Sequence, residues 1–147
     1  MRFLFLLILT LFCGLTVYSC SLSPSNPITI DNAWIREAPP GASAMAGYMN
    51  ITNTSERNLI LHKAESSDFK AIEFHRSVEK DGVYTMVPHL HLHINAASSI
   101  ELKPGDYHLM MFSPKRELKS GDEAEIKLIF SNNLSITVAV PVKKAVY

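Results

Sequence analysis

The segment YHLMMF, residues 107–112, has the alternation of an extended strand. Successive side chains of a β-strand point to opposite faces, so His108 and Met110 share one face while Leu109 and Met111 share the other. The second pair is ordinary core material, whereas the first pair combines an imidazole with a thioether. We therefore expect one face of this strand to pack in a core and the other to present two potential metal ligands.

The chain on either side of this strand contains further short strand-like segments, many of them alternating, and few helix signals. These segments are ITIDNAWIRE, MAGYMNITN, LILHKAE, KAIEFHRS, VYTM, HLHLHI, SSIEL, YHLMMF, EAEIKLIF and LSITVAVPV. Turn sequences such as APPG, EKDG and KPGD separate them. Nine or ten short strands at such intervals predict an all-β domain, an antiparallel sandwich or barrel.

The N-terminus has the layout of an export signal. Arg2 precedes an apolar run over residues 3–17 that is too short to span a bilayer comfortably. The run ends in VYSC, which resembles a bacterial lipoprotein cleavage box whose cysteine, here Cys20, becomes the lipidated first residue. Tyr18 is bulkier than that box prefers, so an ordinary cleaved signal remains an alternative.

This layout predicts the domain organisation and the location. We expect residues 1–19 to be a signal peptide, 20–27 a tether, and 28–147 one β-sandwich domain in the periplasm or another extracytoplasmic compartment, anchored to the membrane through a lipid on Cys20. Both cysteines lie within or at the end of the signal, so the domain has no thiol and no disulfide. Acidic and basic residues balance at 14 each, without like-charge runs, so no nucleic-acid partner is expected.

The segment HLHLHI, residues 89–94, holds half of the six histidines. It interleaves His89, His91 and His93 with Leu90, Leu92 and Ile94. Such alternation is typical of a half-buried strand with a polar outer face. A secondary Cu(II) or Zn(II) site is the alternative, because histidines two apart on a strand can chelate a metal. A cupin-like site would also need a nearby acidic ligand, and Glu101 follows only beyond a turn.

Four residues far apart in the chain form a second pattern, H-x10-M-x21-H-x-M. They are His75, Met86, His108 and Met110. Two neutral imidazoles and two thioethers make a soft donor set, which suits Cu(I) and has little to offer Mg(II), Ca(II) or Zn(II). Each residue alone has an ordinary explanation, since methionine is a common core filler and strand histidines are often partly exposed. We assign Met45 and Met49 to the core in this way; only the joint pattern indicates a Cu(I) site.

With these residues the chain resembles the periplasmic copper chaperones of the PCu(A)C type, whose hallmark is H(M)-x10-M-x21-H-x-M. Further similarity runs through AWIREAPPGASAMAGYMNITN and LKPGDYHLMMF and covers most of residues 28–142. The resemblance implies a cupredoxin-like antiparallel sandwich that binds Cu(I) through the four side chains. It also implies delivery to the binuclear copper site of cytochrome c oxidase, in subunit II, directly or with another copper chaperone. Arg76 replaces a second methionine of many relatives, an optional position, so we expect no effect on binding.

The donor set predicts transfer of Cu(I) by ligand exchange and no catalysis. Blue-copper electron transfer requires a thiolate, which residues 28–147 lack. A zinc hydrolase built on HLHLH would need a general base, and no carboxylate has a suitable spacing. Two alternatives stay open: a non-catalytic extracytoplasmic interaction module in which every histidine and methionine is structural, and a general periplasmic copper-sequestering protein.

Overall fold

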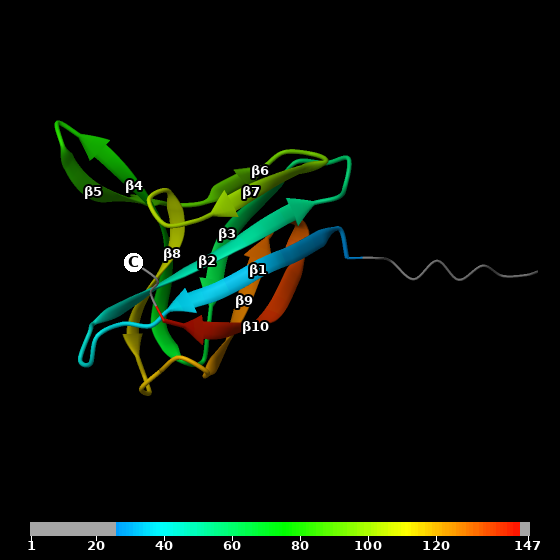
Figure 1. Cartoon of the computed structure of the whole chain (residues 1–147). Coiled ribbons are helices and arrows are strands. Elements are labelled where there is room, and N and C mark those ends of the chain that lie inside the picture. The colour runs from blue at the N-terminus through cyan, green and yellow to red at the C-terminus, as the bar shows by residue number, and fades with distance from the viewer. Residues whose placement is uncertain (1–25, 145–147) are drawn as a thin grey trace, which may run out of the picture.

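The computed structural model describes residues 26–144, and within them the chain forms ten β-strands, one short 3₁₀ turn and no α-helix (Figure 1). The elements are β1 (Ile28–Arg36), β2 (Ala44–Asn53), β3 (Leu59–Glu65), β4 (Phe69–Lys80), β5 (Val83–His89), β6 (Leu92–Ile94), β7 (Ser98–Leu102), β8 (Tyr107–Pro114), β9 (Glu123–Phe130), η1 (Ser131–Asn133) and β10 (Ser135–Lys143). The predicted signal peptide and Cys20 lie outside the described residues. No helix in the described part of the chain has the length and apolar character needed to cross a bilayer.

The strands pair in the order β5-β4-β8-β2-β1-β10-β9-β3-β6, with β7 also paired to β2. Apolar side chains from both halves of this order, among them Leu109 of β8 and Ile126 of β9, belong to one buried cluster. The sheet therefore curls so that its two halves cover a common core, which confirms the predicted all-β sandwich or barrel. One pairing is parallel, between β1 and β10, where Ile35 lies opposite Val142. Such a pairing needs no tight turn, because the two strands are far apart in the chain.

The alternation of β8 is confirmed on its core side. Leu109 and Met111 have no exposed surface, and Met45 and Met49 are buried as predicted. A Cβ atom on Gly47 of β2 would lie 3.0 Å from Cε of Met111, so the absence of a side chain at Gly47 lets Met111 pack against the neighbouring strand. The burial of Leu109 and Met111 shows which side of β8 faces the core, and strand alternation places His108 and Met110 on the other side.

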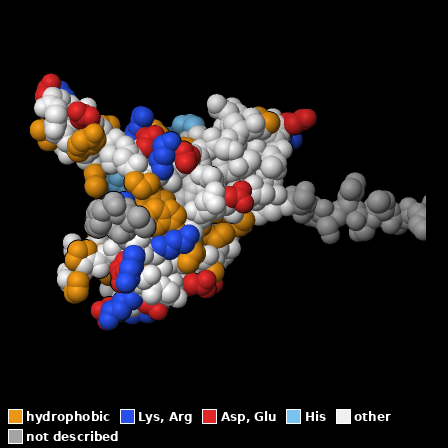
Figure 2. All heavy atoms as spheres, viewed as in Figure 1, with side chains coloured by type: hydrophobic (Ala, Val, Ile, Leu, Met, Phe, Trp, Pro, Cys, Tyr) orange, Lys and Arg blue, Asp and Glu red, His pale blue; other side chains and the backbone are white. Residues whose placement is uncertain are grey.

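Strands β4 and β5 form a hairpin that projects from the body of the protein (Figure 1). Its two-residue turn consists of Asp81 and Gly82, both with positive φ, as the Asp-Gly sequence predicts. β5 exposes a run of large hydrophobic side chains, among them Val83 and Tyr84, and Figure 2 shows hydrophobic atoms along this hairpin.

The sequence prediction for residues 89–94 is wrong at Leu90. We expected Leu90 to share an apolar face with Leu92 and Ile94, yet Leu90 is 89% exposed while the other two are buried. β5 ends at His89, and the chain then bends toward β6, which pairs with β3. The alternation therefore spans two strands, and the face on one side of a bend does not continue on the other.

Candidate metal centre

The strand register brings the four predicted ligands to one face of the β5-β4-β8 portion of the sheet. His75 of β4 lies directly opposite His108 of β8, and Met110 lies two residues further along β8. Met86 of β5 lies opposite Ser77, which is two residues from His75 on β4. Directly opposed residues have Cβ atoms about 5 Å apart and diagonal neighbours about 7–8 Å, which long side chains span. All four side chains thus project from one face of the sheet, with Met86 and Met110 on opposite sides of the His75–His108 pair: their partners on β4, Ser77 and Glu73, lie two residues to either side of His75.

The two imidazoles face one another with ring centroids 6.0 Å apart. Nδ1 of His108 lies 2.9 Å from the carbonyl oxygen of Asp106, and Nε2 of His75 lies 2.9 Å from Oε2 of Glu73. Carbonyl and carboxylate oxygens accept hydrogen bonds, so each of these ring nitrogens is the donor and carries the proton. Nε2 of His108 and Nδ1 of His75 are consequently the nitrogens with free lone pairs.

Those two free nitrogens are buried and have no hydrogen-bond partner. A buried polar atom left in this state costs about 1–3 kcal/mol, so its presence calls for an explanation. A metal-binding histidine shows this same arrangement, in which the outer ring nitrogen donates to a carboxylate or carbonyl and the inner nitrogen is kept for the metal. The two histidines therefore have the hydrogen-bonding arrangement of metal ligands. The other unpartnered buried side-chain atom in the described residues is Nε of Arg36.

Exposure increases from the histidines toward the methionines. His108 is 3% exposed, the side chain of His75 is 13% exposed, and Met110 is partly buried, whereas Met86 on the projecting hairpin is 58% exposed. His108 is enclosed more than an ordinary strand histidine because the ring of Tyr48 on β2 lies 6.5 Å from its ring, between centroids. The candidate site thus has a closed imidazole side and an open thioether side.

Tyr48 itself is held by Trp34, with ring centroids 4.6 Å apart, and by the Arg36 guanidinium, 5.5 Å from the centre of the phenol ring. Burial raises the pKa of the Tyr48 phenol, and the nearby Arg36 charge only partly opposes this shift. The phenol is therefore neutral at physiological pH. The Tyr48 ring beside His108 therefore adds no charge to the candidate site.

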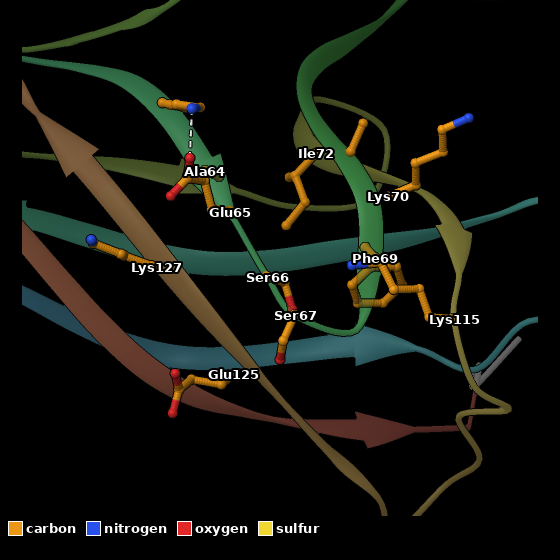
Figure 3. Close-up of a pocket in the computed structure, with 12 residues that line it drawn as sticks. Ala64, Glu65, Ser66, Ser67, Phe69, Lys70, Ile72, Lys115, Glu125 and Lys127 are labelled. Atoms are coloured by element: carbon orange, nitrogen blue, oxygen red, sulfur yellow. Dashed lines mark ion pairs between the residues drawn. The ribbon is translucent and has the colours of Figure 1, made fainter.

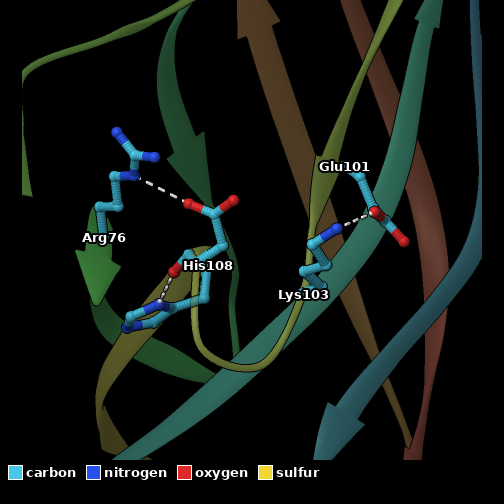
Figure 4. Close-up of polar contacts among 5 residues, drawn as sticks. Arg76, Glu101, Lys103 and His108 are labelled. Carbon is cyan, nitrogen blue, oxygen red and sulfur yellow. Dashed lines mark hydrogen bonds and ion pairs between the residues drawn. The ribbon is translucent and has the colours of Figure 1, made fainter. Parts of the chain in front are cut away.

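An ion pair between Arg76 and Asp106 stabilises the turn whose carbonyl oxygen orients His108 (Figure 4). Nε of Arg76 donates to Oδ1 of Asp106 at 2.8 Å, and the guanidinium also lies over the Tyr107 ring at 4.8 Å. The backbone N–H of Ser77 donates to the same Asp106 carbonyl oxygen that accepts from His108. The Asp106 hydrogen bond raises the pKa of Arg76, which stays charged. Arg76 thus contacts the turn, and nothing places its guanidinium among the ligands.

Sequence reasoning missed the two hydrogen-bond partners of the imidazoles. Glu73 precedes His75 by two residues on the same strand face, so the strand alternation contained a signal that could have identified it. Asp106 contributes its backbone carbonyl oxygen, for which residue type is no guide. That contact depends on the shape of the turn between β7 and β8.

The histidines of residues 89–94 separate into two environments. Nε2 of His91 lies 3.1 Å from Nε2 of His93, whereas the His89 ring packs edge-on against Tyr107 with 5.2 Å between centroids. His89 lies opposite Phe74, whose side chain is buried, and so faces away from the side of β4 that carries His75. Among residues 26–144, no group of three or more His, Cys, Asp or Glu side chains is arranged to hold a metal.

The hollow between β3 and β4 has a volume of about 600 Å³ and a different character (Figure 3). Its lining combines charged side chains with small polar ones and Phe69, and it contains no histidine or methionine. Lys63 and Glu65 pair with each other there at 2.5 Å. The four predicted ligands therefore lie elsewhere, on the β5-β4-β8 face.

The profile of a family described as "Putative lipoprotein LpqE-like" matches residues 28–142. "Putative lipoprotein Lxx21020" of Leifsonia xyli subsp. xyli is 32% identical over 117 residues, which are 79% of this chain and 69% of that protein. "Uncharacterized protein RP573" of Rickettsia prowazekii is 33% identical over 104 residues, 68% of this chain and 56% of that protein. The chain thus spans little more than half the length of the second relative.

Solved structures give the same fold. The copper-bound PCuAC domain from PmoF2 superposes with a TM-score of 0.70 at 22% identity, covering 81% of this chain and 94% of that domain. Apo-DR1885 from Deinococcus radiodurans gives 0.64 at 26% identity over 84% and 83% of the two chains. The CuI form of DR1885 gives 0.60 at 25% identity over 88% and 85%. These likenesses confirm the PCuAC-type fold that the sequence resemblance implied.

Proposed function

The chain belongs to the LpqE-like family, and from the site on its β5-β4-β8 face we propose that it is an exported Cu(I)-binding metallochaperone. The proposed ligands are His75, Met86, His108 and Met110. One observation carries the proposal: two facing imidazoles each hold an unpartnered, buried nitrogen toward the same face while their other nitrogens donate to fixed acceptors. A purely structural role for both rings would leave these polar atoms without any compensation.

The donor types identify the cargo. Two thioethers beside two neutral imidazoles favour Cu(I) over Zn(II) or Mg(II), and no described residue of the site is an anionic ligand. The solved relatives support this choice, since DR1885 has a structure in its CuI form at 25% identity to this chain. Cu(I) is thus the substrate that the protein carries, and we expect no catalytic turnover.

The graded exposure of the ligands supports transfer by ligand exchange. The enclosed histidines would retain the ion while Met86, exposed on the hairpin edge, is the ligand that an acceptor can displace first. Thioether sulfur binds without losing a proton, so this exchange needs no acid or base. A copper-sequestering protein would gain by enclosing every ligand, and the exposure of Met86 favours the chaperone for this reason.

The location and the acceptor extend the proposal. The names of the family and of the Leifsonia relative contain the word lipoprotein, which supports an extracytoplasmic protein anchored through Cys20. The acceptor implied by the PCu(A)C resemblance is the binuclear copper site in subunit II of cytochrome c oxidase. Mixing Cu(I)-loaded protein with the metal-free soluble domain of that subunit should move copper to the acceptor; retention of all copper by the donor would reject this acceptor.

X-ray absorption of the Cu(I)-loaded protein tests the binding site directly. We expect both sulfur and imidazole nitrogen neighbours in the unmodified protein, and fewer sulfur neighbours in Met110→Leu. The matched control is Met49→Leu, because Met49 is 2% exposed and lies in the core. An identical sulfur contribution in Met110→Leu and the unmodified protein, or a loss in Met49→Leu, would reject the assignment.

A further inference from the structure

His91 and His93 place two imidazole nitrogens side by side, outside the Cu(I) site. Their Nε2 atoms are 3.1 Å apart, with ring centroids at 4.8 Å and ring planes at 83°. Both residues are exposed, whereas Leu92 between them is buried. Anchoring of Leu92 in the core therefore directs the histidine on either side of it outward.

The separation of the two nitrogens matches a shared metal ion. Imidazole nitrogens bind zinc at about 2.0–2.1 Å, so two of them on one ion lie about 2.9 Å apart at a right angle and about 3.4 Å at a tetrahedral angle. The observed 3.1 Å falls between these values. We propose that His91 and His93 form a second metal site, a pair of imidazole ligands for Cu(II).

The hollow around this pair supports a borderline divalent ion and not Cu(I). About 480 Å³ in volume, it is lined by imidazole, aromatic and aliphatic side chains and contains no sulfur. Neutral imidazole suits Cu(II), Zn(II) and Ni(II), and Cu(II) binds most tightly in that series. With two protein ligands, the remaining positions of a tetragonal Cu(II) ion are left to water. The third histidine of the segment, His89, lines the same hollow but packs against Tyr107.

Metal binding at this pair requires a change of tautomer and a rotation of the rings that directs both Nε2 lone pairs at the ion. In the metal-free protein one Nε2 carries a proton and donates to the other across 3.1 Å. When Cu(II) accepts both Nε2 lone pairs, the donor ring loses its Nε2 proton to water and takes one from water on Nδ1. Both imidazoles remain neutral and no electron is transferred, so the site binds the ion without a redox step.

The proposed Cu(II) site is separate from the Cu(I) site. Its hollow includes His89 and Tyr107, which lie opposite Phe74 and Arg76 of β4. Alternation along β4 places those two residues on the face away from His75. The two metals would thus bind on opposite sides of the β4 strand, Cu(I) with imidazole and thioether donors and Cu(II) with imidazole donors alone.

The test adds Cu(II), as its glycine complex, to protein already saturated with Cu(I) under argon, because bound Cu(I) is silent in electron paramagnetic resonance. We expect a Cu(II) spectrum with nitrogen hyperfine structure, and an affinity at least about tenfold lower in His91→Gln/His93→Gln. The control His62→Gln removes an exposed histidine of β3 that does not line this hollow and should leave the affinity within about twofold.

Two results would overturn the proposal. One is a double variant that keeps the Cu(II) affinity of the unmodified protein, since the ion would then bind elsewhere. The other is an equal loss in His62→Gln, since the ion would then not be bound by the His91–His93 pair alone. His91 and His93 are both exposed, so the thermal unfolding midpoint of the double variant should equal that of the unmodified protein. The single variants His91→Gln and His93→Gln provide a second measurement of the loss in Cu(II) affinity. Cu(I) affinity, measured separately, distinguishes failure of this site from failure of the chaperone proposal.

Discussion

Replacement of Met86 by leucine separates a metal-binding methionine from a packing methionine. Met86 is 58% exposed, so less than half of its surface contributes to burial. A fully buried methionine side chain gains about 1.5–3 kcal/mol, which leaves a contribution on the order of 1 kcal/mol for Met86. Leucine is close in volume and apolar and retains most of this. We expect the free energy of unfolding of the copper-free protein to change by less than about 0.5 kcal/mol.

Cu(I) affinity should respond in the opposite way. Met86→Leu removes one of four proposed donors, and we expect a loss of at least about tenfold, equivalent to about 1.4 kcal/mol. The matched control is Met111→Leu on β8, which faces the core with no exposed surface. The Met111 methyl group packs close over Gly47, where a shorter, branched leucine cannot reach, so stability should fall by about 1 kcal/mol while Cu(I) affinity is unchanged.

Two measurements decide between these roles. Anaerobic titration against a chromogenic Cu(I) chelator gives the affinity, and urea unfolding of the copper-free protein gives the stability. We expect opposite effects: Met86→Leu loses Cu(I) affinity and keeps its stability, whereas Met111→Leu loses stability and keeps its Cu(I) affinity. If Met86→Leu binds Cu(I) as tightly as the unmodified protein, or if Met111→Leu loses as much affinity as Met86→Leu, then a four-ligand site that includes Met86 is refuted.

Three further predictions follow from the same geometry. Glu73→Ala removes the acceptor that holds the His75 ring, so Cu(I) affinity should fall about tenfold in the chelator titration, with little change in unfolding because the Glu73 side chain is 54% exposed. Gly47→Ala places a Cβ atom 3.0 Å from Cε of Met111 and should lower stability by about 1–3 kcal/mol in thermal unfolding; an unchanged midpoint would contradict that contact. Cu(I) affinity should also weaken from about pH 8 to about pH 5, because protons compete for the free nitrogens of His75 and His108. A flat profile would argue against histidine ligation.

The strand pattern was readable in the sequence wherever one side of a strand is buried. Alternation over residues 107–112 predicted that Leu109 and Met111 enter the core, and the Asp-Gly pair predicted the tip of the β4–β5 hairpin. The same reasoning failed at Leu90, because period-two alternation does not reveal a bend between two strands that pair with different partners.

Spacing in the sequence selected the four candidate ligands but left their environments open. The amino-acid sequence does not indicate that His108 is almost fully enclosed while Met86 is exposed. These environments depend on the strand order, in which β8 lies between β4 and β2 and β5 is an edge strand. The tautomer of the His108 ring was equally hidden, since the Asp106 acceptor is a backbone carbonyl in a turn. The pairing of β4 with β5 and β8 brings the four residues, which are far apart in the sequence, to one face of the sheet.

The amino-acid sequence alone determined the all-β class, the side of each regular strand that is apolar, and the soft character of the donors, because these follow from residue type and the two-residue period of a strand. Only the tertiary structure decided that His75 lies opposite His108 and that each ring has a buried nitrogen without a hydrogen-bond partner. Pairing between strands is a long-range property: it depends on the whole core closing, and no local stretch of chain contains it.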